Sequence, residues 1–418
     1  MTIQNDHPLG AVPKTERKGF WSIASVLAGF TFFTSTMWAG GSLGVAFSFS
    51  ELLLIIFIGN LLLGAYASGL AYVAYQTGLN TVLLGRYSFG SQGSKLSDFI
   101  LGFTQIGWYA WGTATIAIIL TKLLNLPDAW QIPLMIVFGF GFCISAAIGY
   151  KAIALLSKIS VPLMLIFIAI SFIKGFADVG GLSELASIAP VESMTFAVAI
   201  TTVFGTFVSG GTQATNWSRF SNSGKTAVIA TLAAFFIGNG LMVFVGAFGA
   251  LVYQQADIVD ILVAQGFILI AVLMLFTNIW TTQDNTIYNF AAAGCNLLNT
   301  DKRKLITVVG AAIGTLLAIF GMYNMLIPFL VLLGTFIPPI GAIIMTDFWF
   351  RFRADADLLA STEPVKFNYA GLAAYVVGSA CAYYSPWVAP IVGIVVSSAV
   401  YCALVVVLGM SDKDSKTA

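Results

Sequence analysis

The chain is a succession of apolar runs, each about 20 residues long, with little sequence left between them. A run of that length crosses the roughly 30 Å hydrocarbon core of a bilayer as an α-helix. Hydrophobic residues make up 58% of the sequence and charged residues only 9%. This composition excludes a soluble domain of ordinary kind. We therefore expect an all-α integral membrane protein that has the lipid bilayer as its surroundings.

The runs and their breaks predict twelve transmembrane helices. We expect them near 20–47, 51–76, 97–124, 130–150, 153–175, 193–217, 225–254, 262–292, 304–321, 323–349, 368–384 and 387–409. Polar tails at 1–19 and 410–418 flank them. The first tail lacks the pattern of a cleaved secretory signal, so the first helix is expected to direct insertion.

Basic residues indicate the orientation of these spans. With the N-terminus in the cytoplasm, all of the 19 Lys and Arg residues except Lys122 and Lys174 fall on the cytoplasmic side. Positively charged loops mark the cytoplasmic face of membrane proteins. Both termini are therefore expected in the cytoplasm. Because the charge is sorted by side rather than gathered in one basic patch, we expect no nucleic-acid partner.

Ionisable side chains are scarce inside the spans. The single histidine, His7, lies in the N-terminal tail, and Asp284 is the one acid placed deep in a span. Proton-driven carriers usually need buried titratable groups, so their shortage favours a neutral substrate and a coupling ion held by neutral oxygens. Na⁺ fits that description, and proton coupling stays open. No metal cluster, catalytic triad or phosphate loop indicates an enzyme, and we expect no cofactor.

Two spans carry the same polar, glycine-rich interruption. The first contains FFTSTMWAGGSLG (32–44) and the sixth contains FGTFVSGGTQATN (204–216). Close helix packing would explain one glycine pair. Two pairs five spans apart indicate a transporter with inverted repeats, in which unwound backbone lines a site in the middle of the membrane. The repeats are then expected at 20–175 and 193–349, followed by two further helices at 368–409.

A polar stripe in the eighth span points to an ion site. Asn278, Thr281, Thr282 and Asn285 of NIWTTQDN (278–285) are spaced to share one helix face. Threonines that bond back to their own helix are the alternative explanation. Four polar residues on one face, opposite two broken spans, favour a hydrated cavity. The two hydroxyls, with a carbonyl near 278 and carbonyls freed in the first span, predict an all-oxygen Na⁺ site.

Aromatic and amide side chains at the same level suggest a flat substrate. Trp108 follows Gln105 by one helical turn, and Phe207 precedes the interruption of the sixth span. A lone aromatic residue in a span usually serves packing. Beside an amide and a backbone gap, Trp108 and Phe207 are predicted to stack on a ring whose polar edge meets Gln105 and Asn278. A nucleobase has that shape.

These segments resemble the nucleobase-cation symporter family over nearly the whole chain. The likeness rests on RKGFWSIASVLAGFTFFTSTMWAGGSLG (17–44), IGNLLLGAYASGLAY (58–72), TGLNTVLLGRYSFGSQGS (77–94), TQIGWYAWG (104–112) and NIWTTQDNTIY (278–288). It implies a LeuT-like fold of two inverted five-helix repeats plus two C-terminal helices. It also implies sodium-coupled uptake by alternating access across the bacterial cytoplasmic (inner) membrane. Some relatives carry a second tryptophan at Phe207, so this chain is expected to take a smaller single-ring base, cytosine.

The resemblance also assigns residues to two sites. Trp108 and Phe207 would stack on the base, and Gln105 and Asn278 would hydrogen-bond to it. Further substrate contacts would come from Thr206, Ser209 and Gly210 in the sixth span and from Phe33, Thr34 and Ser35 in the first. Sodium would be held by the carbonyls of Gly29, Phe32 and Asn278 and the hydroxyls of Thr281 and Thr282. The family pattern gives Asp284 no role.

Three alternatives remain open. A passive facilitator or channel would use the same polar stripe without sodium, although broken repeats argue against an open pore. A second alternative is a proton-coupled or passive carrier of another small heterocycle, such as uracil, allantoin or a hydantoin. Amide side chains can read either edge of a base after a flip, so they do not fix the substrate. A membrane enzyme is the third and weakest alternative. We expect the chain to act as a monomer.

Overall fold

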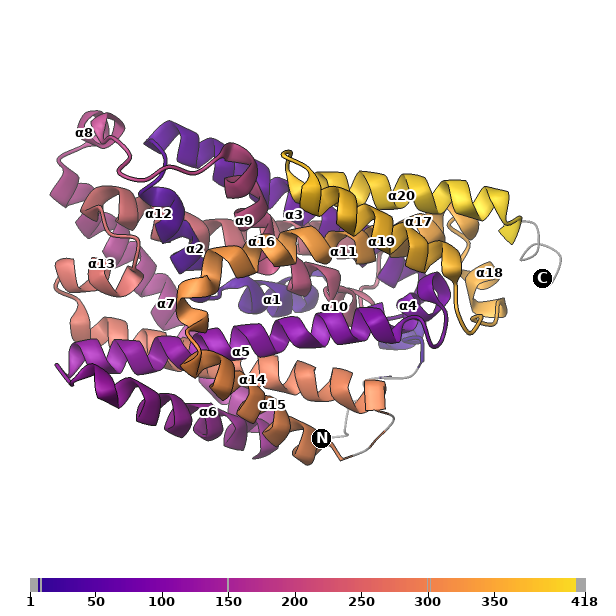
Figure 1. Cartoon of the computed structure of the whole chain (residues 1–418), viewed down its shortest axis with the longest axis horizontal. Helices are drawn as coiled ribbons and strands as arrows, with labels where there is room; N and C mark the ends of the chain where they lie inside the picture. The colour runs from indigo at the N-terminus through magenta and orange to yellow at the C-terminus, as the bar shows by residue number, and fades with distance from the viewer. Residues whose placement is uncertain (1–6, 8–9, 149, 299, 301, 411–418) are drawn as a thin grey trace.

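A computed structural model describes residues 7, 10–148, 150–298, 300 and 302–410 (Figure 1). Side chains are not described at 145–161, 163, 268–275, 277, 281, 285, 292 and 296. Helices make up nearly all of the described chain, and only one isolated β-bridge, between Lys18 and Ser221, occurs in it. The prediction of an all-α protein is confirmed for this part of the chain.

The helices follow one another with short connections. Residues up to 187 form η1 (Lys14–Glu16), α1 (Phe20–Thr31), α2 (Ser35–Gly44), α3 (Phe49–Thr77), α4 (Thr81–Phe89), α5 (Lys95–Leu123), η2 (Asp128–Trp130), α6 (Gln131–Ile148), α7 (Tyr150–Val179) and α8 (Leu182–Ser187). Residues 196–298 form α9 (Phe196–Thr212), α10 (Thr215–Ser218), α11 (Gly224–Ala233), the π-helical η3 (Ala234–Asn239), α12 (Gly240–Tyr253), α13 (Ile258–Ala264) and α14 (Ile268–Leu298). The remainder forms α15 (Arg303–Ile319), η4 (Met322–Met325), α16 (Leu326–Phe336), α17 (Pro338–Thr346), the π-helical η5 (Asp347–Arg351), α18 (Ala356–Ser361), α19 (Tyr369–Tyr384) and α20 (Ala389–Val407).

Several of these helices are long and apolar enough to cross a membrane. Within the described residues, four meet that requirement by length and composition, or five when the bent pair α1 and α2 counts as one span. Most of their large side chains that face outward are hydrophobic, for example Phe57 at 53% and Val395 at 59% exposed. Such apolar outer surfaces are expected of a protein that faces lipid.

The first span is broken, as predicted, but not at its glycines. α1 and α2 meet at an angle of 60° across residues 32–34. Gly40 and Gly41 lie inside α2. A Cβ on Gly40 would come within 2.0 Å of the carbonyl oxygen of Val243 in α12, and one on Gly41 within 2.0 Å of that of Ala256. The prediction that this pair interrupts the helix is therefore wrong, and the pair serves close packing.

The sixth span is interrupted after its glycine pair. α9 stays helical through Gly210 and Gly211 to Thr212, and the chain turns at 213–214 before α10. A Cβ on Gly210 would lie 2.8 Å from the ring of Phe30, so this glycine admits an aromatic ring of α1. The carbonyl oxygen of Thr212 accepts a hydrogen bond from the hydroxyl of Thr81 at 2.6 Å. α4 thus satisfies a carbonyl that the turn releases.

The predicted eighth span begins too early. The expected start near 262 falls within α13, which ends at Ala264, and the long helix α14 begins only at Ile268. Gly266 has φ of 77°, a left-handed conformation that glycine adopts without strain and that ends a helix. A short helix therefore precedes the span, separated from it by a glycine turn.

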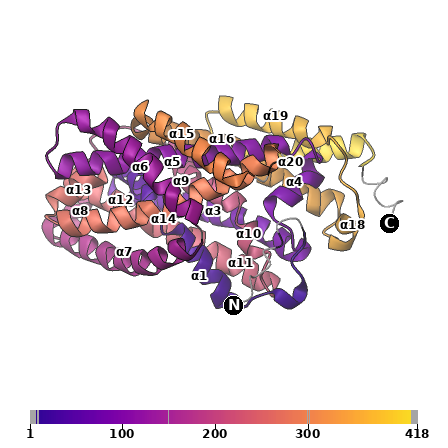
Figure 2. The same cartoon turned by 90° about the horizontal axis from the view of Figure 1, so that it is seen from below.

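The short connecting helices gather at two opposite ends of the molecule. Figure 1 shows α8 and α13 at one end of the long axis and α4 and α18 at the other, with long helices such as α5 and α20 running along it. Seen from below, the same separation holds (Figure 2). The connections after predicted spans five and seven, which hold α8 and α13, thus lie apart from those after spans two and ten, which hold α4 and α18.

Candidate functional site

The side chain of Asn278 in α14 holds the break between α1 and α2. Its amide oxygen accepts hydrogen bonds from the backbone N–H of Thr34 at 3.1 Å and from the hydroxyl of Thr34 at 2.7 Å. Its amide nitrogen donates to the carbonyl oxygen of Phe32 at 3.3 Å. Thr34 and Asn278 are buried, where hydrogen bonds to polar backbone are most needed. Asn278 therefore pairs with backbone that a continuous helix would have satisfied itself.

The same break releases carbonyl oxygens that were predicted to bind sodium. In a continuous helix the N–H of Phe33 would bond to the carbonyl of Gly29, but here it donates to the carbonyl of Thr31 at 2.9 Å. The end of α1 also carries the negative end of the helix dipole. Oxygens at such half-helix ends suit a cation. The Gly29 carbonyl and the Phe32 carbonyl, which Asn278 contacts, thus lie at one break.

Thr282 bonds back to its own helix. Its hydroxyl donates to the carbonyl oxygen of Asn278 at 2.9 Å. This is the arrangement that was weighed as the alternative for a threonine in a span. It places two predicted sodium ligands in direct contact, and each oxygen keeps a further lone pair. The side chains of Thr281 and Asn285 lie outside the described residues.

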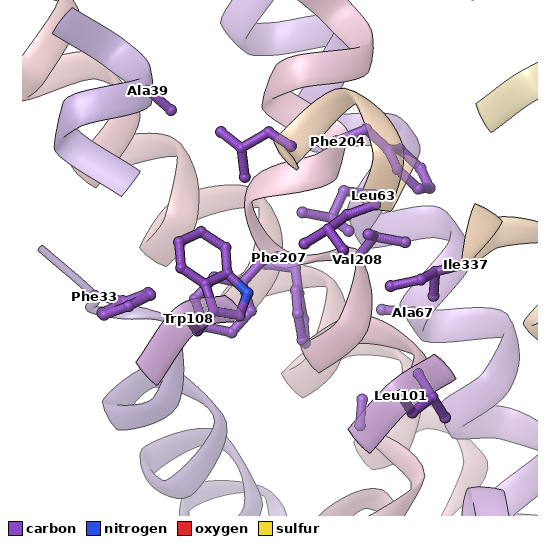
Figure 3. Packing of buried hydrophobic residues seen from close by; sticks show 14 of the residues in the cluster. Phe33, Ala39, Leu63, Ala67, Leu101, Trp108, Phe204, Phe207, Val208 and Ile337 are labelled. Atoms are coloured by element: carbon purple, nitrogen blue, oxygen red, sulfur yellow. The ribbon is translucent and has the colours of Figure 1, made fainter. Parts of the chain in front are cut away.

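Three aromatic rings form one cluster, one from the break itself and two from helices α5 and α9. Phe33 meets Trp108 of α5 edge-on, with ring centroids 5.4 Å apart, and meets Phe207 of α9 edge-on at 6.1 Å. Figure 3 shows the three side chains beside one another. Trp108 and Phe207 were predicted as two faces around a base. Each of them packs against Phe33, and we call these three rings the aromatic wall.

Several predicted polar contacts are buried close to these rings in the sequence. Ser35 begins α2, is 1% exposed, and its hydroxyl has no hydrogen-bond partner among the described residues. Gln105 lies one turn before Trp108 on α5 and is 7% exposed. Ser209 in α9 is also buried. Among the described residues, the hydroxyl of Ser35 is thus a buried polar group without a hydrogen-bond partner at the start of the second half-helix.

Thr206 belongs to a different polar network. Its hydroxyl donates to the carbonyl of Val203 at 2.6 Å and accepts from the amide of Asn239 at 2.9 Å. The Asn239 amide also donates to the side-chain oxygen of Asn60 in α3 at 2.8 Å. The Thr206 hydroxyl therefore belongs to a network that joins α9, η3 and α3, and not to the ring cluster. A lone asparagine in each of two apolar spans was the signal that sequence reasoning missed.

Gln283 and Asp284 turn away from the stripe, as their spacing predicts. The amide of Gln283 donates to the carbonyl of Tyr109 at 2.7 Å and to the hydroxyl of Thr113 at 3.0 Å, both in α5. Asp284 is fully buried and lies close enough to Tyr109 and Cys143 to interact with both electrostatically. These two residues join α14 to its neighbours α5 and α6.

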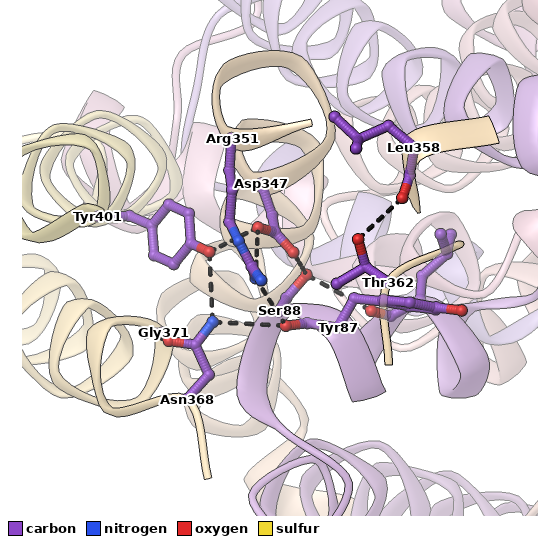
Figure 4. A network of polar contacts seen from close by, with 10 residues as sticks. Tyr87, Ser88, Asp347, Arg351, Leu358, Thr362, Asn368, Gly371 and Tyr401 are labelled. Carbon is purple, nitrogen blue, oxygen red and sulfur yellow. Dashed lines mark hydrogen bonds and ion pairs between the residues drawn. The ribbon is translucent and has the colours of Figure 1, made fainter. Parts of the chain in front are cut away.

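A second buried polar cluster, missed from the sequence, lies around η5. Asp347 accepts hydrogen bonds from Ser88 of α4 at 2.9 Å and from the hydroxyl of Tyr401 of α20 at 2.6 Å. Arg351 approaches the same carboxylate at 3.5 Å, and the Asn368 amide donates to the hydroxyl of Tyr401 at 3.3 Å (Figure 4). This cluster ties the last two helices to α4 and to the end of the preceding span. The i, i+4 spacing of an acid and a base at the end of an apolar run was its signal.

Comparisons with known sequences match most of the chain. The profile of a family described as permease for cytosine/purines, uracil, thiamine and allantoin matches residues 11–406. The cytosine permease of Escherichia coli (strain K12) is 37% identical over 392 residues, which cover 94% of this chain and 92% of that protein. The cytosine permease of Escherichia coli O157:H7 matches to the same extent.

Solved transporters share the fold. The inward-facing conformation of Mhp1 superposes with a TM-score of 0.82 at 16% identity, over 98% of this chain and 96% of that one. Mhp1, a nucleobase-cation-symport-1 family transporter, in a closed conformation with bromovinylhydantoin bound gives 0.79 at 17% identity, over 99% of both chains. A Na⁺-coupled sialic acid symporter in a substrate-bound outward-open state gives 0.66 at 13% identity, over 94% and 90%.

Proposed function

The chain belongs to the family of permeases for cytosine/purines, uracil, thiamine and allantoin, and from this membership we propose that it imports cytosine together with Na⁺ by alternating access. It is a membrane transporter and not an enzyme. The cytosine permeases of Escherichia coli are the relatives that support cytosine as substrate. The choice of a single-ring base also rests on Phe207, a smaller side chain than tryptophan, beside Trp108.

The bonds between Asn278 and the first-span break carry this proposal. One residue contributes a backbone carbonyl to the expected ion site and a side-chain amide to the backbone that begins α2. In our proposal Na⁺ binds the carbonyls of Gly29, Phe32 and Asn278 and the hydroxyls of Thr281 and Thr282. A shell of uncharged oxygens suits a monovalent cation, so no carboxylate needs to take part.

Sodium at these oxygens would prepare the base site through Asn278. The ion would fix the end of α1 against α14, and the two hydrogen bonds from Thr34 would then hold the first turn of α2. Phe33 lies in the chain between Phe32 and Thr34, which both contact Asn278, and its ring packs against those of Trp108 and Phe207. We therefore propose that the base stacks in this wall. Ser35, Ser209 and Gln105 would offer it polar contacts, with Gly210 nearby.

Two predicted roles change in this arrangement. The amide of Asn278 would hold the break rather than read the base, because its oxygen already accepts two hydrogen bonds. Thr206 would support α9 through Asn239 rather than touch the base. Polar recognition of cytosine would then fall to Gln105 and the serine hydroxyls.

We further propose the topology that the sequence predicts. Twelve spans would form two inverted repeats at 20–175 and 193–349, with the two helices at 368–409 attached to them. Both termini would lie in the cytoplasm of a bacterium, in its inner membrane, and the chain would act as a monomer. The separation of α4 and α18 from α8 and α13 supports this alternation of loops (Figure 1). The interruptions of the first and sixth spans support the repeat.

Uptake of labelled cytosine into proteoliposomes tests the function. An inward Na⁺ gradient is compared with equal K⁺ on both sides, and unlabelled uracil, hypoxanthine and a hydantoin serve as competitors. We expect accumulation above the external concentration only with the Na⁺ gradient, and competition by cytosine well ahead of the others. Simple equilibration in both conditions would show a passive carrier. Accumulation driven by a proton gradient without Na⁺ would show proton coupling, and preferential competition by uracil or a hydantoin would change the substrate.

A further inference from the structure

The short helix α13 is packed into the end of the molecule that α2 approaches. Four of its seven residues, Ile258, Val259, Ile261 and Leu262, are at most 3% exposed. The carbonyl of Ala256, just before the helix, lies so close to Gly41 of α2 that no Cβ would fit between them. Apolar burial of this extent costs free energy to undo. α13 therefore covers this end of α2 as a lid, and we use that word for residues 254–267.

Charged side chains fasten one edge of the lid. Lys122, at the end of α5, donates to Asp260 at 2.8 Å and to Asp257 at 3.3 Å. These side chains are 21–41% exposed, so the ion pairs by themselves contribute little. The other oxygen of Asp257 caps α13 by accepting from the N–H of Val259 at 2.9 Å. Asp257 thus both begins the lid helix and carries its outward contacts.

The hydroxyl of Tyr323 joins the lid to α2. It donates to the carboxylate of Asp257 at 2.6 Å and accepts from the indole N–H of Trp38 at 3.0 Å. Tyr323 lies in η4, between α15 and α16, and Trp38 lies in α2. Hydrogen bonds to a carboxylate are shorter and stronger than those between neutral groups. A single oxygen therefore links three segments that are distant in sequence.

The ring of Tyr323 connects this link to the aromatic wall of the candidate site. It stacks on Trp111 with an interplanar angle of 8° and centroids 6.0 Å apart. Trp111 follows Trp108 by one turn of α5, and the two indoles meet edge-on at 6.5 Å. Trp111 also meets Trp38 edge-on at 5.1 Å. A continuous series of rings therefore leads from the wall to the hydroxyl that holds the lid.

We propose that Tyr323 is a positioning residue that latches the lid closed, and that binding of the base at the aromatic wall favours the closed lid. The second part rests on the proposed function, whereas the latch itself does not. To open the lid, the Tyr323 hydroxyl must release Asp257, while the indole N–H of Trp38 keeps it beside α2. A ligand that fixes Trp108 restricts Trp111 and, through the stacked ring, keeps the Tyr323 hydroxyl in place. Lid closure and base binding then favour each other.

Hydrogen–deuterium exchange of residues 254–267 in the purified full-length protein tests the latch. Tyr323→Phe keeps the ring stacked on Trp111 and removes only the hydroxyl. We expect exchange in the lid to rise about tenfold or more, the effect of losing a hydrogen bond to a charged group. Tyr383→Phe on α19, where the side chain is 58% exposed, is the matched control and should exchange like wild type.

Asp257→Asn supplies a second variant that retains a capping side chain. Because Asp257 also pairs with Lys122, its variant should exchange at least as fast as Tyr323→Phe, and if the two residues act through one bond, the double variant should exchange little faster than Asp257→Asn alone. Lid exchange in Tyr323→Phe equal to that in wild type and in Tyr383→Phe would overturn the latch. Fully additive effects in the double variant would also overturn it.

Cytosine added at saturating concentration with Na⁺ tests the coupling. We expect it to slow lid exchange in wild type and to have much less effect in Tyr323→Phe. Equal protection of both proteins would overturn the coupling. If wild type binds no cytosine, the proposed function fails, while the exchange of the ligand-free proteins still decides whether Tyr323 latches the lid.

Discussion

The side-chain oxygen of Asn278 accepts two hydrogen bonds from Thr34, a residue 244 positions away, at the point where the first span is broken. This contact joins the start of α2 to α14, and the Asn278 amide nitrogen joins the end of α1 to it through the Phe32 carbonyl. It places an expected ion ligand and the start of the base site within one set of bonds. The following predictions test what depends on it.

Thr34→Val removes the hydroxyl that bonds to Asn278 at nearly constant size. We expect the affinity for cytosine in Na⁺ to fall about tenfold, because a buried amide oxygen loses one of its two donors. Isothermal titration of the purified protein measures it. Thr34→Ser keeps the hydroxyl and should bind nearly as wild type. Asn278→Ala should weaken cytosine binding at least as much. Purely additive effects in the double variant would show that the two residues do not act through one bond.

Trp108→Ala should remove one stacking surface for the base. Stacking of a base on an aromatic side chain is worth about 1–3 kcal/mol, so binding should weaken about 5- to 150-fold. Trp108→Phe should restore part of it. Trp130→Ala, where the indole is 51% exposed in η2, is the control. Unchanged cytosine affinity in Trp108→Ala would remove this residue from the site.

Thr282→Val should mainly affect the response to sodium. The substitution removes the hydroxyl beside the Asn278 carbonyl and keeps the shape of the side chain. We expect a higher Na⁺ concentration for half-maximal cytosine binding, with near-normal affinity once Na⁺ is raised. Thr282→Ser should respond as wild type. A half-maximal Na⁺ concentration equal to that of wild type in Thr282→Val would exclude the hydroxyl as a ligand.

Gly40→Ala tests whether the first glycine pair serves packing. A Cβ there would lie 2.0 Å from the carbonyl oxygen of Val243, so α2 and α12 must separate. We expect a loss of thermal stability of several degrees in differential scanning fluorimetry. Gly141→Ala in α6, where a Cβ would meet nothing within 4 Å, is the control and should be neutral or slightly stabilising. Equal stability of both variants would contradict the packing role.

Asp347→Ala should strongly destabilise the protein. It withdraws the acceptor of Ser88 and Tyr401 and leaves a buried arginine without this carboxylate, a loss of about 3–5 kcal/mol. Lys174→Met disrupts the half-exposed pair with Asp178 and should cost less than about 1 kcal/mol. Thermal unfolding in nanodiscs compares the two. Similar melting temperatures would show that the cluster around η5 contributes little.

Sequence patterns predicted which spans are special better than where they break. Repeated polar and glycine-rich segments identify weakened helices, and the first and sixth spans are indeed interrupted. The location depends on partners that a local pattern does not contain. Asn278 takes the N–H of Thr34, and Gly40 is needed because Val243 comes close. The turn at Gly266 was missed for another reason, because apolar residues continue on both sides of it.

The sequence predicted relations between candidate residues on one helix but not their pairing across helices. Spacing on one helix placed Asn278 and Thr282 together and turned Gln283 away, since helical geometry fixes these relations. It left open whether the amide of Asn278 meets substrate or backbone. Contacts between distant spans, such as that of Asn60 with Asn239, follow from tertiary packing. The lone asparagine in each of these two spans marks a polar contact, but the sequence does not say which residue it meets.

In the proposed mechanism, Na⁺ bound where α1 ends against α14 would prepare the base site through Asn278. The most direct measurement is the equilibrium affinity of the purified protein for labelled cytosine as Na⁺ replaces K⁺ at constant ionic strength and pH. The account predicts that the affinity rises steadily with Na⁺ in wild type and that this rise is largely lost in Asn278→Ala. An affinity that is the same in Na⁺ and in K⁺ would contradict it.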